Sequence, residues 1–247
     1  MRFFGLIGYP LGHSFSKIYF TEKFDKENIP AQYDLYPLEN ISQFSNLISS
    51  VEFTGLNVTI PYKEQVIPFL DELDPIATEI GAVNVIKFHR QNGKLLMKGY
   101  NSDAIGFENA IRPFLKSHHT HALILGTGGA SKAVDYTLRK LGISTTFVSR
   151  KSSPGILSYH DLNQQHMTDN QLIVNCTPLG MSPNTAYCPD IPYELLSPGH
   201  LLYDVIYKPD ETLFMKKGKE RGAVTVNGLE MLYGQAAAAW EIWNRTM

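Results

Sequence analysis

The chain has 247 residues, a length that fits one large domain or two modest ones at about 150 residues per domain. Its 43% hydrophobic, 11% aromatic and 19% charged residues exclude a disordered, collagen-like or low-complexity protein. A formal net charge of −2 gives no overall attraction to nucleic acid or to an anionic membrane surface, so we expect neither as a partner.

Targeting and metal-binding patterns are also missing from the sequence. The first residues lack a signal-peptide pattern and no stretch approaches the roughly 18 apolar residues of a membrane span, so the expected location is the cytoplasm. Two cysteines, Cys176 and Cys188, provide neither a disulfide framework nor a thiolate zinc site. The eight histidines show no metal-ligand spacing, so we expect no metal and interpret the histidines as surface residues.

The first hundred residues alternate between expected strands and helices. Apolar runs predict strands at residues 3–9, 33–36 and 55–60. Ser16 is expected to cap a helix that carries Ile18, Phe20 and Phe24, and apolar residues at helical spacing predict another helix across residues 41–48. Residues 82–88 and 94–98 flank Asn92-Gly93, a pair typical of a tight hairpin turn.

The second half has a more regular pattern. A helix is expected at residues 103–115, and a domain boundary near the polar stretch 116–121. The following expected strands are short and apolar, at residues 121–125, 145–148, 172–175, 201–205 and 223–226. Helices at 131–141 and 213–221 separate some of them, which predicts an open parallel α/β sheet. A last helix, 229–243, carries one stripe formed by Leu229, Leu232, Tyr233, Ala236, Trp240 and Trp243.

A glycine-rich turn lies between the strand at 121–125 and the helix that follows. Its residues are Gly126, Thr127, Gly128, Gly129, Ala130 and Ser131. Gly126 permits a tight turn and Gly128 lets backbone approach a pyrophosphate, whose charge would meet free N–H groups at the helix start. Ser131 stands where a third glycine is usual, which requires slightly looser helix packing. An ordinary tight turn is the alternative, and the strand–turn–helix context favours the dinucleotide interpretation.

The end of the next strand bears on the choice of dinucleotide. About 20 residues beyond the glycines, NAD-binding folds usually carry an acid for the ribose 2′-hydroxyl. Here the residues are Ser149, Arg150 and Lys151, and no acid is present. A guanidinium suits a 2′-phosphate, so the sequence favours NADP over NAD, with a solvated loop as the alternative.

Six further motifs place polar residues just beyond apolar segments, where ligands bind in open α/β sheets. They are Gly8-Tyr-Pro-Leu-Gly-His-Ser14-Phe-Ser16, Gly55-Leu-Asn-Val-Thr59-Ile-Pro-Tyr-Lys63, Gly81-Ala-Val-Asn84 with Asn101-Ser-Asp103, Asn175-Cys-Thr177-Pro-Leu-Gly180, Tyr203-Asp-Val205-Ile-Tyr207, and Asn227-Gly228-Leu-Glu-Met231 continuing to Gln235. With these motifs, nearly the whole chain resembles shikimate dehydrogenase.

The resemblance implies an α/β fold with two domains. It predicts an α/β substrate-binding domain at residues 1–102 and a Rossmann-like, doubly wound NADP-binding domain at residues 103–226, with the C-terminal helix, 227–247, returning to the first domain. The implied reaction is the reversible, NADPH-dependent reduction of 3-dehydroshikimate to shikimate in aromatic amino-acid biosynthesis. The implied partner is therefore a small molecule, and both a monomer and a homodimer stay open.

The same resemblance implies roles for individual residues. Ser14, Ser16 and Tyr207 would contact the substrate carboxylate. Thr59, Asn84, Asp103 and Gln235 would contact the ring hydroxyls. Lys63 would be the catalytic lysine, paired with Asp103. The implied cofactor-binding residues are Gly126, Thr127, Gly128, Gly129, Ala130, Ser149, Arg150, Lys151, Thr177, Val205, Gly228 and Met231.

Physical chemistry supports these roles and also allows purely structural roles for the same residues. A free lysine has a pKa of about 10.4, so desolvation would have to lower the pKa of Lys63 for acid–base work, while Asp103 would act in the opposite direction. The two groups are expected to titrate together, and which of them holds the proton stays open. Alternatively, the serines and Asp103 cap helices and Lys63 is a surface residue. A quinate-specific or NAD-dependent relative and a catalytically silent regulator are the alternative functions.

Overall fold

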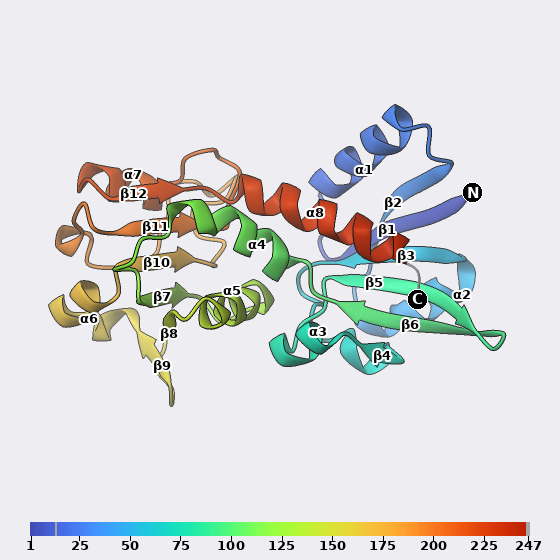
Figure 1. The fold of residues 1–247 in the computed structure, drawn as a ribbon, viewed down its shortest axis with the longest axis horizontal. Helices are drawn as coiled ribbons and strands as arrows, with labels where there is room; N and C mark the ends of the chain where they lie inside the picture. Colours follow the sequence, from blue (N-terminus) through green and yellow to red (C-terminus); the bar gives the residue numbers. More distant parts are fainter. Residues whose placement is uncertain (13, 246–247) are drawn as a thin grey trace. The chain divides into compact units, whose positions relative to one another are not determined.

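The computed structural model describes residues 1–12 and 14–245, which form two compact units. Unit 1 comprises Met1–Ser102 and the chain from Ala236 onward, and unit 2 comprises Asp103–Gln235. Each unit contains one six-stranded sheet with helices (Figure 1). The expected α/β fold is therefore confirmed.

Unit 1 is built on a mixed sheet. Its strands are β1 (Arg2–Gly8), β2 (Ala31–Pro37), β3 (Phe53–Val58), β4 (Glu72–Leu73), β5 (Val85–Gln91) and β6 (Lys94–Tyr100), and its helices are α1 (Phe15–Lys26), α2 (Phe44–Ser50) and α3 (Pro75–Ile80). The strand order is β2-β1-β3-β5-β6-β4. Because β1 runs parallel to both β2 and β3, the segments that follow these three strands all begin at the same edge of the sheet.

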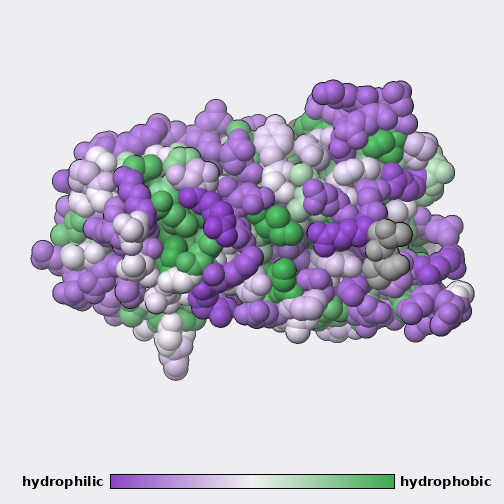
Figure 2. Space-filling view, in the orientation of Figure 1, coloured by the Kyte–Doolittle hydropathy of each residue, from purple (hydrophilic) through white to green (hydrophobic). Residues whose placement is uncertain are grey.

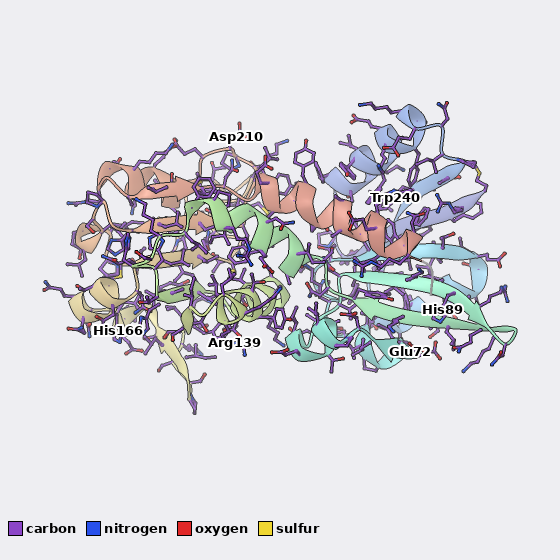
Figure 3. All side chains as sticks on the ribbon, in the orientation of Figure 1. Glu72, His89, Arg139, His166, Asp210 and Trp240 are labelled. Atoms are coloured by element: carbon purple, nitrogen blue, oxygen red, sulfur yellow. The ribbon has the colours of Figure 1, made fainter. Side chains whose placement is uncertain are left out.

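The core of unit 1 lies on both faces of its sheet. Neighbouring residues of β1 enter different apolar clusters, Leu6 one and Ile7 the other, which explains why this strand is apolar almost throughout. The helix α8 (Leu229–Asn244) completes one cluster, because the Trp243 ring lies 4.7 Å from the Phe4 ring and its indole N–H donates to the carbonyl of Ile86. Trp240, on the same helix, is labelled in Figure 3.

The predicted hairpin is confirmed. Strands β5 and β6 pair antiparallel from Val85↔Tyr100 to Gln91↔Lys94. The two turn residues have positive φ angles, 53° at Asn92 and 78° at Gly93, as this kind of tight turn requires.

Unit 2 is built on a fully parallel sheet. Its strands are β7 (His121–Leu125), β8 (Ser144–Ser149), β9 (Ile156–Ser158), β10 (Leu172–Asn175), β11 (Leu201–Asp204) and β12 (Val224–Val226), and its helices are α4 (Asp103–Ile111), α5 (Gly129–Lys140), α6 (Gln164–Asp169), α7 (Leu213–Glu220) and the first part of α8. The order β9-β8-β7-β10-β11-β12 is the Rossmann order 3-2-1-4-5-6 (Figure 1). Ligands bind where this order reverses, at the carboxyl ends of β7 and β10.

Some local predictions are wrong. The residue in the N-cap position of α1 is Ser14, not Ser16, which is the second helical residue. His119 and His200 are only 5% and 3% exposed, so the interpretation of all histidines as surface residues is wrong for these two. Their imidazoles are buried because hydrogen bonds with backbone groups satisfy them.

Helix α8 is not buried along the whole predicted stripe. Tyr233 is 45% exposed, whereas Ala236 and Trp243 lie in the core of unit 1. In residues 1–12 and 14–245, no helix is both long and apolar enough to cross a membrane. The face drawn in Figure 2 is largely hydrophilic and carries smaller hydrophobic areas.

Candidate active site

In unit 1, the segments that follow β1 and β3 are joined by backbone hydrogen bonds. The N–H of Thr59 donates to Ile7 O at 2.9 Å, and the N–H of Tyr9 donates to Ile60 O at 3.0 Å. Ser14, at the N-cap of α1, follows Tyr9 within a few residues, and none of the described N–H groups of the first turn donates to its side chain. The Ser14 and Thr59 segments therefore start from one edge of the sheet.

Ser16 belongs to a buried polar network. The Tyr33 hydroxyl, on β2, donates to Asn57 Oδ1 at 2.7 Å and also shares a hydrogen bond with Ser16. Burial raises the pKa of Tyr33 far above its ordinary value, and the Ser16 hydrogen bond acts in the opposite direction. Tyr33 therefore stays neutral at physiological pH. The hydrogen bond with Tyr33 therefore orients the Ser16 side chain, which was expected to cap the helix.

Asn84 extends this network to the end of β6. Its Oδ1 accepts from the backbone N–H of Ser102 at 2.7 Å, and its Nδ2 donates to Ser102 Oγ at 3.0 Å. Asn57 Nδ2 donates to the Asn84 carbonyl at 3.3 Å. Asn84 is 3% exposed, and these bonds fix its side-chain amide on Ser102 and its backbone carbonyl on Asn57. Neighbouring Asn101 is held in the same way, by donation to Ala82 O at 2.9 Å.

Lys63 and Asp103, the expected catalytic pair, belong to different units. Lys63 follows β3, its side chain is half-buried, and its carbonyl accepts from Val83 N at 2.7 Å, which holds its backbone beside the Asn84 segment. Asp103 is the first residue of α4 and is 6% exposed. The pairing of these two side chains stays a prediction.

The glycine-rich turn of unit 2 lies between β7 and α5, as predicted. Gly126 has a φ of +108°, which favours glycine, and its N–H donates to Val148 O at 2.8 Å. Gly128 is the N-cap of α5, and a Cβ built on it meets no atom within 4 Å, so the space over the turn is open. Ser131 is fully buried, and its hydroxyl donates to Gly128 O at 2.6 Å, so the side chain that replaces a glycine stabilises the turn.

The residues expected to select NADP follow the neighbouring strand. Ser149 ends β8, directly after Val148, and Arg150 and Lys151 are exposed. Because Gly126 bonds to Val148, these cationic side chains begin beside the glycine-rich turn. The Arg150 charge also acts on Tyr159: burial raises the pKa of Tyr159 to about 12, and the Arg150 charge lowers it.

The other predicted cofactor residues follow β10, β11 and β12 at the same edge. Thr177 directly follows Cys176, whose N–H donates to Leu125 O at 2.9 Å. The N–H of Gly228 donates to Ile206 O at 3.0 Å, and a Cβ at Gly228 would collide with the carbonyl of Val205. Glycine is therefore required at position 228 for this close approach. The expected residues Thr127, Gly129 and Ala130 lie in the glycine-rich turn or the first turn of α5.

Of the remaining predicted site residues, Met231 and Gln235 lie on α8, and Tyr207 follows β11. Met231 is 7% exposed and packs in the main core of unit 2. Tyr207 and Gln235 are half-buried, and burial raises the pKa of Tyr207. The predicted close packing beside Gln235 is present at Gly234, where a Cβ would lie 3.0 Å from the Cα of Gly106, whereas Tyr233 is 45% exposed.

The structure adds residues that sequence reasoning left without a role. Asn57 and Tyr33 link Ser16 to Asn84, and Asp204 links the ends of β10 and β11. A single polar residue inside an apolar strand was the available signal for Asn57 and Asp204. Their partners are distant in sequence, so the pattern did not reveal them.

Comparisons with known proteins agree with this geometry. The family model described as the shikimate dehydrogenase substrate binding domain matches residues 6–86, all in unit 1. A protein of Desulforamulus reducens named shikimate dehydrogenase (NADP(+)) is 36% identical over 97% of this chain and 88% of its own length. The chain belongs to the shikimate dehydrogenase family.

Solved structures from the shikimate dehydrogenase family share the whole fold. Shikimate dehydrogenase 1 from Peptoclostridium difficile is 36% identical, with a TM-score of 0.85 over 100% of this chain and 93% of that one. Shikimate 5-dehydrogenase from Thermus thermophilus, solved with NADP(H) and shikimate, is 28% identical, with a TM-score of 0.85 over 99% of this chain and 94% of that one. The likeness thus spans both units.

Proposed function

We propose that this protein catalyses the reversible, NADPH-dependent reduction of 3-dehydroshikimate to shikimate. The observation that carries the proposal is the 36% identity, over 97% of the chain, to a relative named shikimate dehydrogenase (NADP(+)). The Thermus thermophilus relative, solved with NADP(H) and shikimate, supports both ligands. The proposal includes a location in the cytoplasm and a small molecule as the partner. It is compatible with a monomer and with a homodimer.

The two units divide the task in this proposal. Residues 1–102, completed by the C-terminal helix, bind the substrate, and the match of residues 6–86 to a substrate binding domain supports this. Residues 103–226 bind NADP, and the Rossmann strand order supports that assignment.

The residues at the turn of unit 2 fit NADP. The space over Gly128 leaves room for a pyrophosphate, and the first N–H groups of α5 face the turn with the positive end of the helix dipole. The exposed guanidinium of Arg150 suits the 2′-phosphate, with Ser149 and Lys151 beside it. When bound, the nicotinamide supplies the hydride for the carbonyl carbon.

The substrate carboxylate and hydroxyls differ in the groups that would bind them. Ser14, Ser16 and Tyr207 supply hydroxyls for the carboxylate, and Thr59, Asn84, Asp103 and Gln235 supply partners for the ring hydroxyls. The fixed amide of Asn84 supports this role, because a preorganised partner loses little entropy when it binds.

Proton transfer belongs to Lys63 and Asp103 in this mechanism. Reduction of a carbonyl leaves a developing alkoxide, and the Lys63 ammonium donates the proton to that oxygen. Asp103 stabilises the ammonium and orients it. In the reverse direction the neutral amine accepts the hydroxyl proton of shikimate.

The test is the formation of NADPH absorbance when purified protein is mixed with shikimate and NADP⁺ at alkaline pH, which favours oxidation. Rapid reduction of NADP⁺ and much slower reduction of NAD⁺ would support the substrate and the role of Arg150 together. Turnover of quinate, or with NAD⁺ instead, would overturn the specificity. A folded protein that binds NADP⁺ but turns over neither acid would be a silent regulator.

A further inference from the structure

A buried carboxylate ties together the segments at the carboxyl ends of β10 and β11. Asp204, the last residue of β11, has no exposed surface. Its Oδ1 accepts from Asn175 Nδ2 at 3.1 Å and from the backbone N–H of Ile206 at 3.0 Å, and its Oδ2 accepts from Thr212 Oγ1 at 2.6 Å. One carboxylate thereby fixes the end of β10, the segment after β11 and the N-cap of α7.

Asn175 passes this order on to Thr177. Because the Asn175 amide donates to Asp204, its oxygen faces the other way, and it accepts from both the backbone N–H and the hydroxyl of Thr177, at 3.0 and 2.7 Å. With its hydroxyl held there, Thr177 directs its methyl group at the glycine-rich turn: a Cβ on Gly126 would lie 3.2 Å from Thr177 Cγ2. Thr177 therefore packs against the turn that is proposed to hold the cofactor phosphates.

We propose that Asp204 is a positioning residue for NADP, which acts through Asn175 and Thr177 on the glycine-rich turn. The inference rests on the proposed function, because that function assigns NADP as the ligand of the glycine-rich turn. In this proposal Asp204 does not contact the cofactor itself. Its effect depends on how the side-chain amide of Asn175 and the hydroxyl of Thr177 are oriented.

Charge alone predicts the opposite effect, which makes the proposal testable. NADP is an anion, so a negative carboxylate nearby disfavours its binding, and neutralising that carboxylate would strengthen binding. Burial raises the pKa of Asp204 to about 6, and hydrogen bonds from Thr212, Ile206 and Asn175 act in the opposite direction. The carboxylate is therefore largely ionised at neutral pH and can accept from all three donors.

The experiment is calorimetric titration of the full-length variants with NADP⁺ at neutral pH, without substrate. Asp204→Asn keeps the shape of the side chain but gives it an amide, which cannot accept from three donors as a carboxylate does. We expect its Kd for NADP⁺ to rise by about tenfold, the effect of one lost hydrogen bond. The control is Asp169→Asn at the end of α6, whose exposed carboxylate bonds Gln165, and its Kd should stay within about twofold of wild type.

The relay through Thr177 is tested by a double-mutant cycle. Thr177→Val keeps the methyl group and removes the hydroxyl, so its effect on Kd should be smaller in the Asp204→Asn background than in wild type. Fully additive effects, or a Kd for Asp204→Asn that equals or falls below that of Asp169→Asn, would overturn the inference. If thermal unfolding shows that Asp204→Asn does not fold, Asn175→Ala replaces it in the same cycle, with the same expected rise.

Wild-type protein separates the two proposals. If wild type does not bind NADP⁺, the proposed function fails and the positioning inference fails with it. If wild type binds NADP⁺ and Asp204→Asn binds it equally well, only the positioning inference fails.

Discussion

The two units each bury a polar network at the carboxyl edge of their sheet, but one network is neutral and the other is charged. In unit 1, Tyr33, Asn57 and Asn84 connect hydroxyl and amide groups, whereas in unit 2 three donors converge on the carboxylate of Asp204. A neutral network avoids the cost of burying a charge, and a carboxylate can order more segments at once. The comparison predicts that only the unit 2 network responds to pH.

The two proposed binding sites differ in a related way. Unit 1 offers fixed side chains for a small polyol acid, with Asn84 held by Ser102. Unit 2 offers open backbone at Gly128 and exposed cations at Arg150 and Lys151 for phosphates. Changes in unit 1 should therefore affect substrate kinetics, and changes in unit 2 should affect the cofactor.

The largest expected effect is on catalysis by Lys63. Lys63→Ala should lower kcat for shikimate oxidation by about 10²- to 10⁴-fold, the range of general acid–base catalysis, while NADP⁺ affinity stays unchanged. Steady-state kinetics and NADP⁺ titration measure both. The matched control is Lys26→Ala, an exposed lysine in the last turn of α1. Wild-type turnover by Lys63→Ala would remove the lysine from the mechanism.

The next effect concerns Asp204 and pH. Because its folded-state pKa of about 6 lies above the ordinary value of 3.8, the folded protein binds more protons than the unfolded chain between these values. The Asp204 contribution to stability is therefore present at low pH and is lost as pH rises through about 6, by up to about 3 kcal/mol.

Urea unfolding of wild type and Asp204→Asn at pH 4 to 7 measures this loss as a difference between the two proteins. The difference between the two proteins cancels the contribution of carboxyls whose pKa is lowered in the folded protein, which stabilise it more as pH rises. Glu211 is an example, because its hydrogen bond with Lys219 lowers its pKa. Cys176, Tyr193 and Tyr203 face the same region, and burial raises the pKa of each, so they stay neutral throughout. Parallel pH profiles for the two proteins would contradict the prediction.

A smaller effect is expected on the choice of cofactor. Arg150→Ala should raise the KM for NADP⁺ by about 10- to 100-fold, the value of hydrogen bonds to a charged group, and leave the KM for NAD⁺ unchanged. Arg139→Ala is the control, an exposed arginine of α5 that pairs with Asp135 and is labelled in Figure 3. Equal losses with both cofactors would show that Arg150 does not read the 2′-phosphate.

The smallest effect is expected at Ser14. Ser14→Ala should raise the KM for shikimate by about tenfold with little change in kcat, because it removes one hydrogen bond that the substrate keeps in the transition state. Ser45→Ala on α2, an exposed serine of the same unit, should leave both constants unchanged. A fall in kcat with constant KM would instead assign Ser14 to the chemical step.

The sequence predicted those parts of the fold that depend on local pattern. Strands β7, β10 and β11 were visible as apolar runs, and Asn92-Gly93 predicted its hairpin. The sequence pattern did not indicate β9 or α6, because both are short and α6 is mostly polar, with its start set by an Asn163 cap. Such elements depend on caps and tertiary contacts more than on hydrophobic periodicity.

In the candidate site, too, the sequence predicted the parts that depend on contiguous residues and not the parts that depend on distant ones. The glycine-rich turn was predictable because its chemistry is contiguous in sequence, from Gly126 to Ser131. The roles of Tyr33 and Asp204 were not, because the side chains that bond them in these networks lie 8 to 29 residues away and only folding brings them together. His119 and His200 were misplaced for the same reason, since a distant backbone carbonyl bonds Nε2 of each ring.

The C-terminal helix also imposes an order on biosynthesis. Phe4 of the first strand packs against Trp243, so the core of unit 1 joins residues from the two ends of the described chain. A ribosome synthesises all of unit 2 between them. Unit 1 therefore exposes the surface that packs against Trp243 until the last turns of α8 have been synthesised. Chaperones that bind nascent chains would find that surface on unit 1.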